Sequence, residues 1–180
     1  MQKISRFIEY LWNQAMLDNV SNIIALLHNN RNADVLDVGC GDGKSTILFK
    51  KKIVCRKIVG MEGDTDRIKE AKRNGIKDIV TCDLEKRWPL PDGSFDIVIS
   101  NQVIEHIFNI DLFISEIYRV LRPGGYCLIS TENLASWHNI GALILGYQDF
   151  SHHLISKSHV GNPISVNYGE KPGGWGDKAK

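Results

Sequence analysis

The chain contains 180 residues, of which 43% are hydrophobic and 24% are charged. This is the composition of an ordinary folded protein, which excludes global disorder, and the length suits one domain with its own core. The 22 basic and 21 acidic residues leave a net charge of +1, which argues against a broad basic surface for nucleic acid but not against a local basic patch.

The chain opens with an amphipathic segment. Apolar residues recur at helical spacing over Lys3–His28, and we expect one broken helix or two consecutive helices there. The short β-branched run Asp34–Val38 then predicts a strand. It is followed by a glycine-rich turn, Gly39–Gly43, and by a helical pattern over Lys44–Lys52.

Strands and helices continue to alternate beyond this first unit. We predict strands at Lys57–Met61, Ile79–Cys82, Phe95–Ser100 and Tyr126–Thr131, with helices at Thr65–Asn74 and at Asp111–Leu121, the latter stopped by Pro123-Gly124-Gly125. This alternation predicts an α/β fold with a doubly wound, mostly parallel sheet, helices on both faces and right-handed crossovers. Ligands of such sheets bind outside the carboxyl ends of the strands.

The most specific feature is the run Val35–Gly43, in which a strand ends, the chain turns tightly and a helix begins. Glycines there let a ligand approach the backbone, and the helix start offers unpaired N–H groups. The phosphate-loop pattern G-x-x-x-x-G-K-[ST] fails at Val38, and the dinucleotide pattern G-x-G-x-x-G fails at Lys44. An ordinary tight turn is one interpretation. The other is the tighter pattern G-x-G-x-G preceded by an acid, which is met in full by Asp37, Gly39, Gly41 and Gly43.

Acidic residues also end the next two predicted strands. Glu62 stands roughly 20 residues past the glycines, where a carboxylate can accept hydrogen bonds from both hydroxyls of a ribose. Asp83 can accept from an adenine amino group while the backbone N–H of Leu84 meets a ring nitrogen. A solvated loop acid is the alternative for each. We interpret Asp64, just beyond Glu62, as a helix cap or loop residue.

Together these residues resemble a class I S-adenosylmethionine-dependent methyltransferase of the small-molecule type. The resemblance covers Asp34 to about Asn133 and rests on the ordered motifs Val35–Gly43, Val59–Glu62, Cys82–Leu84, Phe95–His106 (FDIVISNQVIEH) and Leu121–Tyr126 (LRPGGY). It implies a Rossmann-like fold of seven strands whose last two form an antiparallel hairpin. That hairpin is not evident apart from a weak strand candidate at Pro163–Tyr168, so a truncated chain is one interpretation.

The resemblance also implies S-adenosyl-L-methionine as the cofactor. No metal is expected, because the sequence shows no set of ligands at metal-binding spacing. By this resemblance, Asp37 is expected to organise the loop and to reach the methionine end of the cofactor. Asn101 and Gln102 are expected to lie beneath the sulfonium and the methionine carboxylate. The other implied contacts are close backbone approach at Gly39, Cys40, Gly41 and Gly43, the ribose at Glu62, and adenine at Cys82, Asp83 and Leu84. Residues 1–133 then hold the N-terminal helices and the cofactor-binding core. Residues 134–180 form a substrate-covering insertion or a flexible tail of the same domain.

His106 is the candidate general base, because it follows the fourth predicted strand and an imidazole with a pKa of ~6.5 accepts a proton near neutrality. A packing or helix-start histidine is the alternative. A base is needed only if the nucleophile must lose a proton.

The leading prediction is therefore an enzyme that transfers a methyl group to oxygen, nitrogen or carbon of a small-molecule acceptor by in-line displacement. The alternative is an S-adenosylmethionine-binding module or truncated domain without turnover. Nucleic acid is not an expected partner, because the turn Ser100–Val103 lacks the proline and aromatic residues that grip a flipped base.

The remaining expectations concern the surroundings of the protein. The four cysteines are scattered without a C-x-x-C pair, which predicts reduced thiols in a cytoplasmic protein rather than a zinc site or disulfide framework. No apolar run reaches the ~18 residues of a membrane span. The sequence leaves the oligomeric state and the identity of the acceptor open.

Overall fold

The structure is a computed structural model that describes residues 2–133 and 135–145. The chain divides into two units, one formed by Asn19–Thr131 and the other by Met1–Asp18 with Glu132–Lys180. The unit Asn19–Thr131 holds the whole sheet and the candidate site.

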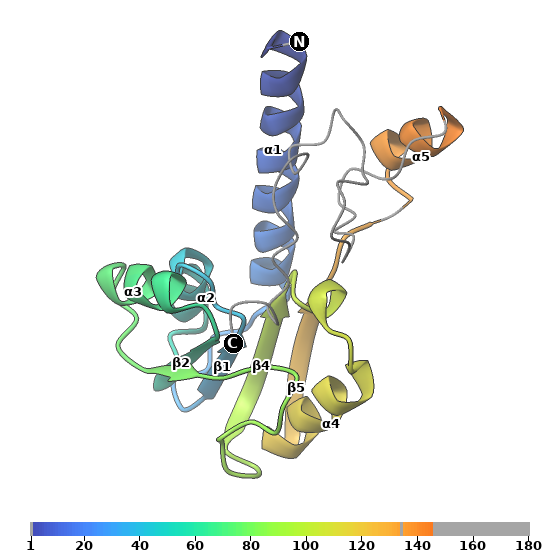
Figure 1. The fold of residues 1–180 in the computed structure, drawn as a ribbon. Helices are drawn as coiled ribbons and strands as arrows, with labels where there is room; N and C mark the ends of the chain where they lie inside the picture. Colours follow the sequence, from blue (N-terminus) through green and yellow to red (C-terminus); the bar gives the residue numbers. More distant parts are fainter. Residues whose placement is uncertain (1, 134, 146–180) are drawn as a thin grey trace. The chain divides into compact units, whose positions relative to one another are not determined.

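The helices and strands alternate as the sequence predicts (Figure 1). In chain order they are α1 (Gln2–Leu26), β1 (Asp34–Val38), α2 (Lys44–Ile53), β2 (Lys57–Glu62), α3 (Thr65–Arg73), β3 (Ile79–Thr81), β4 (Phe95–Asn101), the 3₁₀ helix η1 (Ile104–His106), α4 (Ile110–Val120), β5 (Leu121–Ser130) and α5 (Trp137–Ile144). The expectation of a broken or double first helix is wrong. The segment forms one helix, because it contains neither glycine nor proline to interrupt it.

All five strands form one parallel sheet in the order β3-β2-β1-β4-β5. The chain moves outward from β1 to β3 on one side and then returns to add β4 and β5 on the other. The reversal of direction lies between β1 and β4, and in open α/β sheets such a switch point leaves a crevice outside the carboxyl ends of the strands. The predicted α/β fold with a doubly wound parallel sheet is confirmed.

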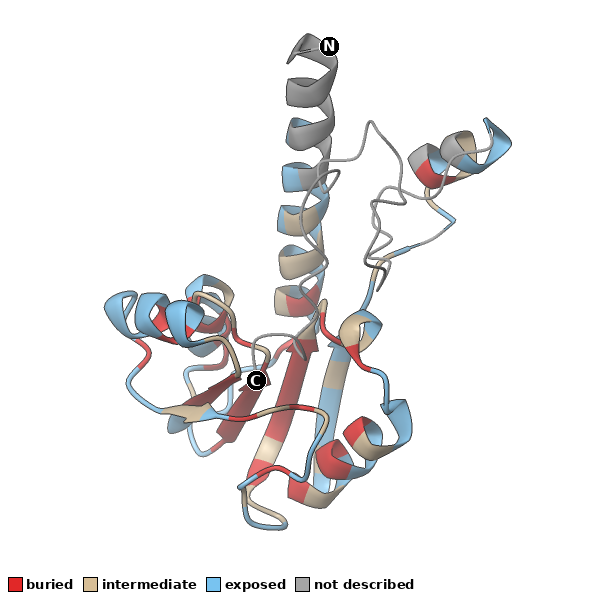
Figure 2. Ribbon diagram, in the orientation of Figure 1, coloured by how far each residue is buried: buried red, intermediate tan, exposed pale blue. Residues whose placement is uncertain are grey.

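Helices cover both faces of this sheet, and Figure 2 shows that β1, β2 and β4 are largely buried, whereas β5 is not. On one face Val35 packs with Ile23 of α1 and Phe49 of α2. On the other face Val98 packs with Phe113 of α4. Since side chains alternate along a strand, the buried run of β1 contributes to both cores, which explains its continuous apolar sequence.

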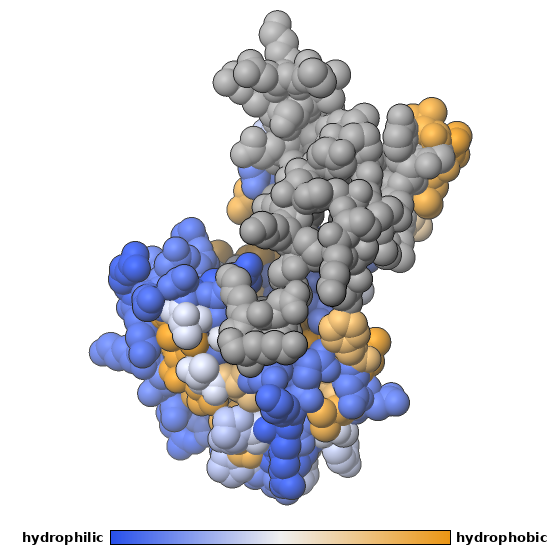
Figure 3. Space-filling view, in the orientation of Figure 1, coloured by the Kyte–Doolittle hydropathy of each residue, from blue (hydrophilic) through white to orange (hydrophobic). Residues whose placement is uncertain are grey.

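Helix α3 packs on the sheet through a narrow apolar stripe. Ile68 and Ala71 are buried, while most other residues of the helix are charged and exposed. This charged outer face is part of the hydrophilic surface on the left of Figure 3. Asp64 caps the helix by accepting hydrogen bonds from the backbone N–H groups of Asp66 and Arg67, as expected for a helix cap.

The last strand begins earlier than the sequence predicts, at Leu121 rather than at Tyr126. Phe95 pairs with Leu121 but Ile97 already pairs with Tyr126, so the Pro-Gly-Gly run is an insertion on the β5 side of the ladder. Gly124 has a φ of 83°, which only glycine adopts readily. Proline and glycine here mark a bulge inside the strand, next to the end of α4, rather than a loop between two elements.

Among the residues that the structure describes, the sheet ends at β5, and the implied antiparallel hairpin is not among them. The strand candidate Pro163–Tyr168 lies outside the described residues. No helix within residues 2–133 and 135–145 is both long enough and apolar enough to cross a membrane.

Candidate functional site

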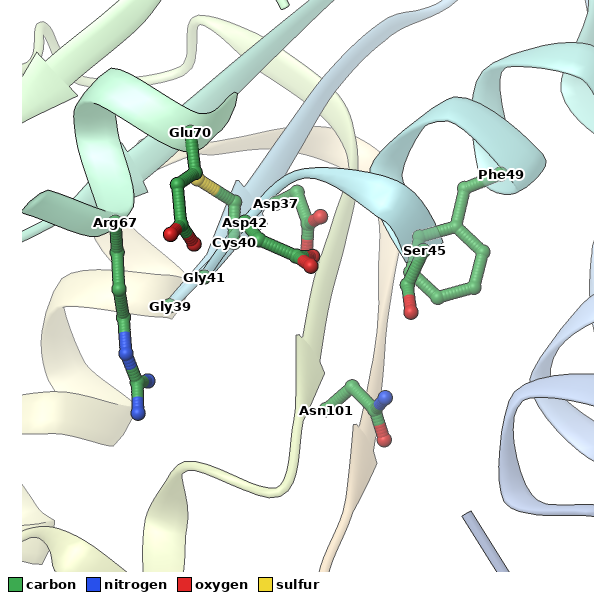
Figure 4. Close-up of a pocket in the computed structure, with 10 residues that line it drawn as sticks. All are labelled: Asp37, Gly39, Cys40, Gly41, Asp42, Ser45, Phe49, Arg67, Glu70 and Asn101. Atoms are coloured by element: carbon green, nitrogen blue, oxygen red, sulfur yellow. The ribbon is translucent and has the colours of Figure 1, made fainter. Parts of the chain in front are cut away.

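A cavity of about 390 Å³ opens at the carboxyl edge of β1 and β4 (Figure 4). Its lining comes from the glycine turn, the start of α2, helix α3 and the end of β4. The lining residues are Asp37, Gly39, Cys40, Gly41, Asp42, Ser45, Phe49, Arg67, Glu70 and Asn101. The cavity thus lies at the switch point of the sheet, where the topology favours a ligand.

The three glycines of the turn have different surroundings. All have positive φ, at 70° for Gly39, 55° for Gly41 and 78° for Gly43. A Cβ atom added to Gly39 would lie 2.5 Å from Val103, and one added to Gly43 would lie 2.7 Å from Ile76. At Gly41 no atom of the described protein lies within 4 Å of such a Cβ. Gly39 and Gly43 therefore allow the protein to pack on itself, whereas Gly41 leaves bare backbone at the cavity.

Asp37 forms a wall of the cavity and is almost fully buried, at 3% exposure. Its Oδ2 atom accepts a hydrogen bond of 2.5 Å from the hydroxyl of Thr46 on α2. Burial raises the pKa of Asp37 to about 7, against the opposing effect of the Thr46 hydrogen bond and with a further contribution from the charge of Glu62. A carboxyl group that titrates near neutrality in a cavity wall favours a cationic group of a ligand.

Glu62, at the end of β2, is fully buried and holds the glycine turn from within. Its Oε2 accepts a 2.9 Å hydrogen bond from the Gly41 N–H, and its Oε1 accepts one of 2.9 Å from each of the Gly63 and Asp64 N–H groups. Burial raises the pKa of Glu62, and these backbone hydrogen bonds oppose that shift. In the described part of the chain Glu62 is not among the residues that line the cavity.

Cys40 lines the cavity as a neutral thiol. Burial raises its pKa to about 12, and the nearby charge of Asp37 adds to the shift. Its sulfur packs against Gly60 of β2, where an added Cβ would lie 2.7 Å from Sγ. Since the thiolate is the nucleophilic form of cysteine, Cys40 has a packing role here.

The residues expected at adenine lie after β3, and none of them is in the lining of the cavity. Leu84 is buried in the core, and the Cys82 thiol donates to the Asp83 carbonyl. The Asp83 carboxylate pairs with Lys86 at 3.0 Å and accepts a hydrogen bond from the Glu85 N–H. Burial alone would raise the pKa of Asp83, but these partners outweigh it and hold the pKa below its usual range.

Asn101 is the last residue of β4 and lines the cavity from the side opposite the turn (Figure 4). Its Oδ1 accepts hydrogen bonds of 2.6 Å from both Asn19 Nδ2 and Ser130 Oγ. The amide of Asn101 is therefore held by α1 and β5 as well as by its own strand.

Gln102 and His106 follow Asn101, and neither is in the lining of the cavity. Gln102 has a φ of 55°, and its N–H donates to the carbonyl of Ser130 at 3.1 Å. His106 ends η1, and its side chain is half-buried. The chain thus turns sharply away from the strand end before it reaches the candidate base.

The sequence did not indicate that α3 reaches the site. Arg67 and Glu70, three residues apart on this helix, line the cavity beside Asp42 of the turn. Asp42 pairs with Lys44 at 2.6 Å, and the Lys44 hydrogen bonds outweigh burial to hold the pKa of Asp42 low. One sequence signal could have indicated this: Arg67 and Glu70 are three residues apart in the first turns of the helix that follows Glu62, the acid at the carboxyl end of β2. Within residues 2–133 and 135–145, no three or more His, Cys, Asp and Glu side chains form a group that could hold a metal ion.

A comparison with known protein families identifies this arrangement. Residues 36–129, more than half of the chain, match the family described as "Methyltransferase domain". The chain belongs to this family. The match begins within β1 and ends within β5, so it covers all but the outermost residues of the sheet and every residue that lines the cavity.

Curated relatives of this methyltransferase domain are longer proteins. A Mycolicibacterium smegmatis protein named "Probable S-adenosylmethionine-dependent methyltransferase" is 37% identical over 108 residues, covering 60% of this chain and 41% of that protein. The mitochondrial ubiquinone biosynthesis O-methyltransferase of Rattus norvegicus is 34% identical over 107 residues, covering 55% of this chain and 30% of that protein. The chain thus spans less than half the length of these relatives.

Solved structures agree with the fold of the methyltransferase domain. The phosphoethanolamine N-methyltransferase 2 of Haemonchus contortus, solved with phosphomonomethylethanolamine and S-adenosylhomocysteine, aligns with a TM-score of 0.57 at 27% sequence identity. The alignment covers 67% of this chain and 28% of that one.

Proposed function

We propose that this methyltransferase domain binds S-adenosyl-L-methionine and transfers its methyl group to a small-molecule acceptor. The observation that carries the proposal is the bare backbone of Gly41 over a cavity walled by the buried acid Asp37. S-adenosylmethionine carries two positive charges, on its sulfonium and its ammonium, and one negative charge on its carboxylate. A buried carboxyl group with a pKa near neutrality suits such a ligand.

The chemistry of the remaining cavity groups fits the same ligand. Asp37 suits the ammonium of the methionine end, and the amide of Asn101 supplies N–H donors for its carboxylate. Gly41 allows close approach of the backbone. Further residues are proposed to contribute to cofactor binding, with Glu62 acting through the turn that it holds. The others are Cys82, Asp83, Leu84 and Gln102.

The proposed reaction is an in-line displacement. S-adenosylmethionine, when bound, supplies a methyl group on a positively charged sulfur, which leaves as a neutral thioether with the electrons of the broken bond. The protein contributes position, because holding nucleophile and methyl carbon in a near-attack arrangement supplies ~7–11 kcal/mol. Where the nucleophile carries a proton, we propose His106 as the group that accepts it.

The acceptor class rests on the relatives. The named functions include methylation in ubiquinone biosynthesis and methylation of phosphoethanolamine, and both acceptors are small molecules. We propose a small molecule with an oxygen, nitrogen or carbon nucleophile for this chain too. We further propose that residues 134–180 form a substrate-covering insertion or a flexible tail of the same domain.

A second candidate is a cofactor-binding module without turnover. It is favoured by the position of the candidate base His106, which is not among the described residues that line the cavity. In that case the cavity binds S-adenosylmethionine, but no acceptor is methylated.

A cytoplasmic location is proposed in either case, since the four cysteines Cys40, Cys55, Cys82 and Cys127 are unpaired thiols.

Calorimetric titration tests the proposal. We expect S-adenosylmethionine and S-adenosylhomocysteine to bind at one site, with NADH as a negative control. Transfer of a labelled methyl group to members of an acceptor panel then separates the enzyme from the binding module. Absence of binding by both adenosyl compounds overturns the proposed function, and binding without transfer to any acceptor favours the module.

A further inference from the structure

Three polar side chains from three elements meet beside the cavity. Asn19 Nδ2, on α1, donates to Asn101 Oδ1 at 2.6 Å and to Ser130 Oγ at 3.3 Å. Ser130 Oγ, on β5, donates to the same Asn101 Oδ1 at 2.6 Å. Asn101 and Ser130 are register partners on neighbouring strands, so their side chains share one face of the sheet. All three residues lie within the unit Asn19–Thr131.

This network fixes which end of the Asn101 amide faces the cavity. A carbonyl oxygen accepts two hydrogen bonds through its lone pairs, and Asn19 and Ser130 use both. Since the carboxamide is planar, fixing the oxygen also fixes the nitrogen. Among the residues that the structure describes, Asn101 Nδ2 donates no hydrogen bond, although Asn101 lines the cavity.

The Nδ2 donors of Asn101 lie on the same side of the sheet as the buried acid Asp37. Asp37 pairs with Ile99 across β1 and β4, and Asn101 is two residues beyond Ile99. Side chains two residues apart on a strand point to the same face. The two-residue offset along the strand, combined with the spacing of about 4.8 Å between neighbouring strands, places Asp37 and Asn101 about 8 Å apart. The cavity wall therefore presents an acceptor at Asp37 and donors at Asn101 on one face of the sheet, and the ammonium and carboxylate of one amino acid can lie between them.

We propose that Asn19 and Ser130 are positioning residues, which hold the amide of Asn101 so that its N–H groups bind the carboxylate of the amino-acid end of S-adenosylmethionine. The inference rests on the proposed function. It gives helix α1 a part in cofactor recognition, although no residue of α1 lines the cavity in the described part of the chain. Without Asn19 and Ser130, the amide is free to turn its oxygen toward the carboxylate, which repels it.

A double-mutant cycle on the 180-residue chain tests the coupling. We expect Asn19→Ala to raise the Kd of S-adenosylhomocysteine about fivefold and Asn101→Ala to raise it about tenfold, the scale of one or two hydrogen bonds. In the Asn101→Ala background, Asn19→Ala should change the Kd by less than about twofold, because Asn19 acts through Asn101. Asn22→Ala, an exposed asparagine on the same helix, is the matched control and should leave the Kd unchanged.

A truncated ligand separates positioning from general damage to the site. 5′-Methylthioadenosine shares the adenine, the ribose and the sulfur but lacks the amino-acid end. Asn19→Ala and Ser130→Ala should weaken S-adenosylhomocysteine without weakening this ligand. Equal weakening of both ligands, or additive effects in the cycle, overturns the positioning role. If 5′-methylthioadenosine does not bind the wild type, the cycle alone decides.

A ligand-free readout distinguishes failure of this inference from failure of the proposed function. In NMR spectra of the apo protein, Asn19→Ala should shift and broaden the side-chain amide signals of Asn101, and Asn22→Ala should not. Unchanged Asn101 signals overturn the network. If Asn19→Ala changes the Asn101 signals but the wild type binds no adenosyl compound, the proposed function is overturned, and with it the ligand assigned to Asn101. A wild type that binds S-adenosylhomocysteine without coupling between Asn19 and Asn101 overturns this inference alone.

Discussion

The carboxylate of Glu62 accepts a hydrogen bond from the backbone N–H of Gly41 at 2.9 Å, so the end of β2 holds the turn that follows β1. The same carboxylate receives the N–H groups of Gly63 and Asp64. A buried acid that collects three backbone donors fixes the path of two loops at once. The shape of the cavity therefore depends on a residue that does not line it.

Glu62→Gln should disturb both loops. An amide has one oxygen for two sets of donors, so its NH₂ group must face a backbone N–H, and leaving a buried polar group unpaired costs about 1–3 kcal/mol. We expect this loss in the free energy of unfolding, measured with denaturant, together with weaker binding of S-adenosylhomocysteine. The control is Asp66→Asn, an exposed acid paired with Lys69, which should change stability by less than about 1 kcal/mol. Wild-type stability in Glu62→Gln would contradict the anchoring role.

Local sequence patterns were sufficient for the strands and the turn of this site. The β-branched run and the glycines that follow it determine β1 and the bend by short-range backbone preferences, and the predicted bounds Asp34–Val38 agree with the structure. The resemblance implied a cofactor role for Asn101, and the local sequence placed it at the end of a buried strand, at the ligand edge of the sheet. These features need no knowledge of distant contacts.

The features that sequence could not supply depend on packing between distant elements. Arg67 reaches the cavity because Ala71 and Ile76 lie against Gly43, a contact that no local pattern encodes. The inward direction of Glu62 depends on the positive φ of Gly41, which presents an N–H to it. An acidic residue at the end of a strand gives the same sequence pattern whether its side chain faces the cavity or the protein interior. The pattern alone therefore cannot distinguish a ligand contact from an internal one.

The loop glycines should separate folding from binding. Gly43→Ala places a methyl group 2.7 Å from Ile76 and 3.2 Å from the Ala71 backbone, so it should lower Tm strongly. Gly41→Ala meets only open space, and its cost to folding is limited to the positive φ, about 1 kcal/mol. We still expect it to weaken S-adenosylhomocysteine at least tenfold, because the methyl group enters the cavity.

The matched control for this pair of variants is Gly93→Ala. Gly93 has the same φ of 55° as Gly41, its added Cβ comes no closer than 4.0 Å to another residue, and it is not among the residues that line the cavity. It should lower Tm as much as Gly41→Ala does, with no change in Kd. Normal binding by Gly41→Ala would remove the turn from the cofactor site.

His106 should affect turnover alone. If it accepts the proton of the nucleophile, His106→Gln should lower kcat about 10²-fold or more at neutral pH while the Kd of S-adenosylhomocysteine stays as in the wild type. His28→Gln, an exposed histidine that follows α1, is the control. An unchanged kcat for an acceptor that must lose a proton would show that His106 is a packing residue.

Binding of the cationic cofactor should strengthen as the pH rises toward neutrality. In the free protein the pKa of Asp37 is about 7, and a bound cation favours the ionised form and lowers that pKa. Affinity measured by calorimetry should therefore rise by up to about tenfold per pH unit below 7 and level off above it. Thr46→Val removes the hydrogen bond that lowers the pKa of Asp37, so the same transition should move to higher pH. Affinity independent of pH between 5 and 8 would remove Asp37 from the ligand.

Stability of the ligand-free protein should depend on Asp37 in the opposite direction. The pKa of Asp37 is about 7 in the folded state, against an ordinary value of 3.8, so the folded state binds the proton more tightly than the unfolded state. The stability that this proton provides is complete below pH 3.8 and is lost as the pH rises to about 7. Asp37→Asn keeps an acceptor for Thr46 without a charge, so its stability relative to wild type should increase between pH 4 and pH 8, by on the order of 3 kcal/mol. Denaturant unfolding at the two pH values measures this difference. A constant difference between the two proteins would mean that Asp37 is ionised at both pH values, and that the cavity wall carries a permanent negative charge.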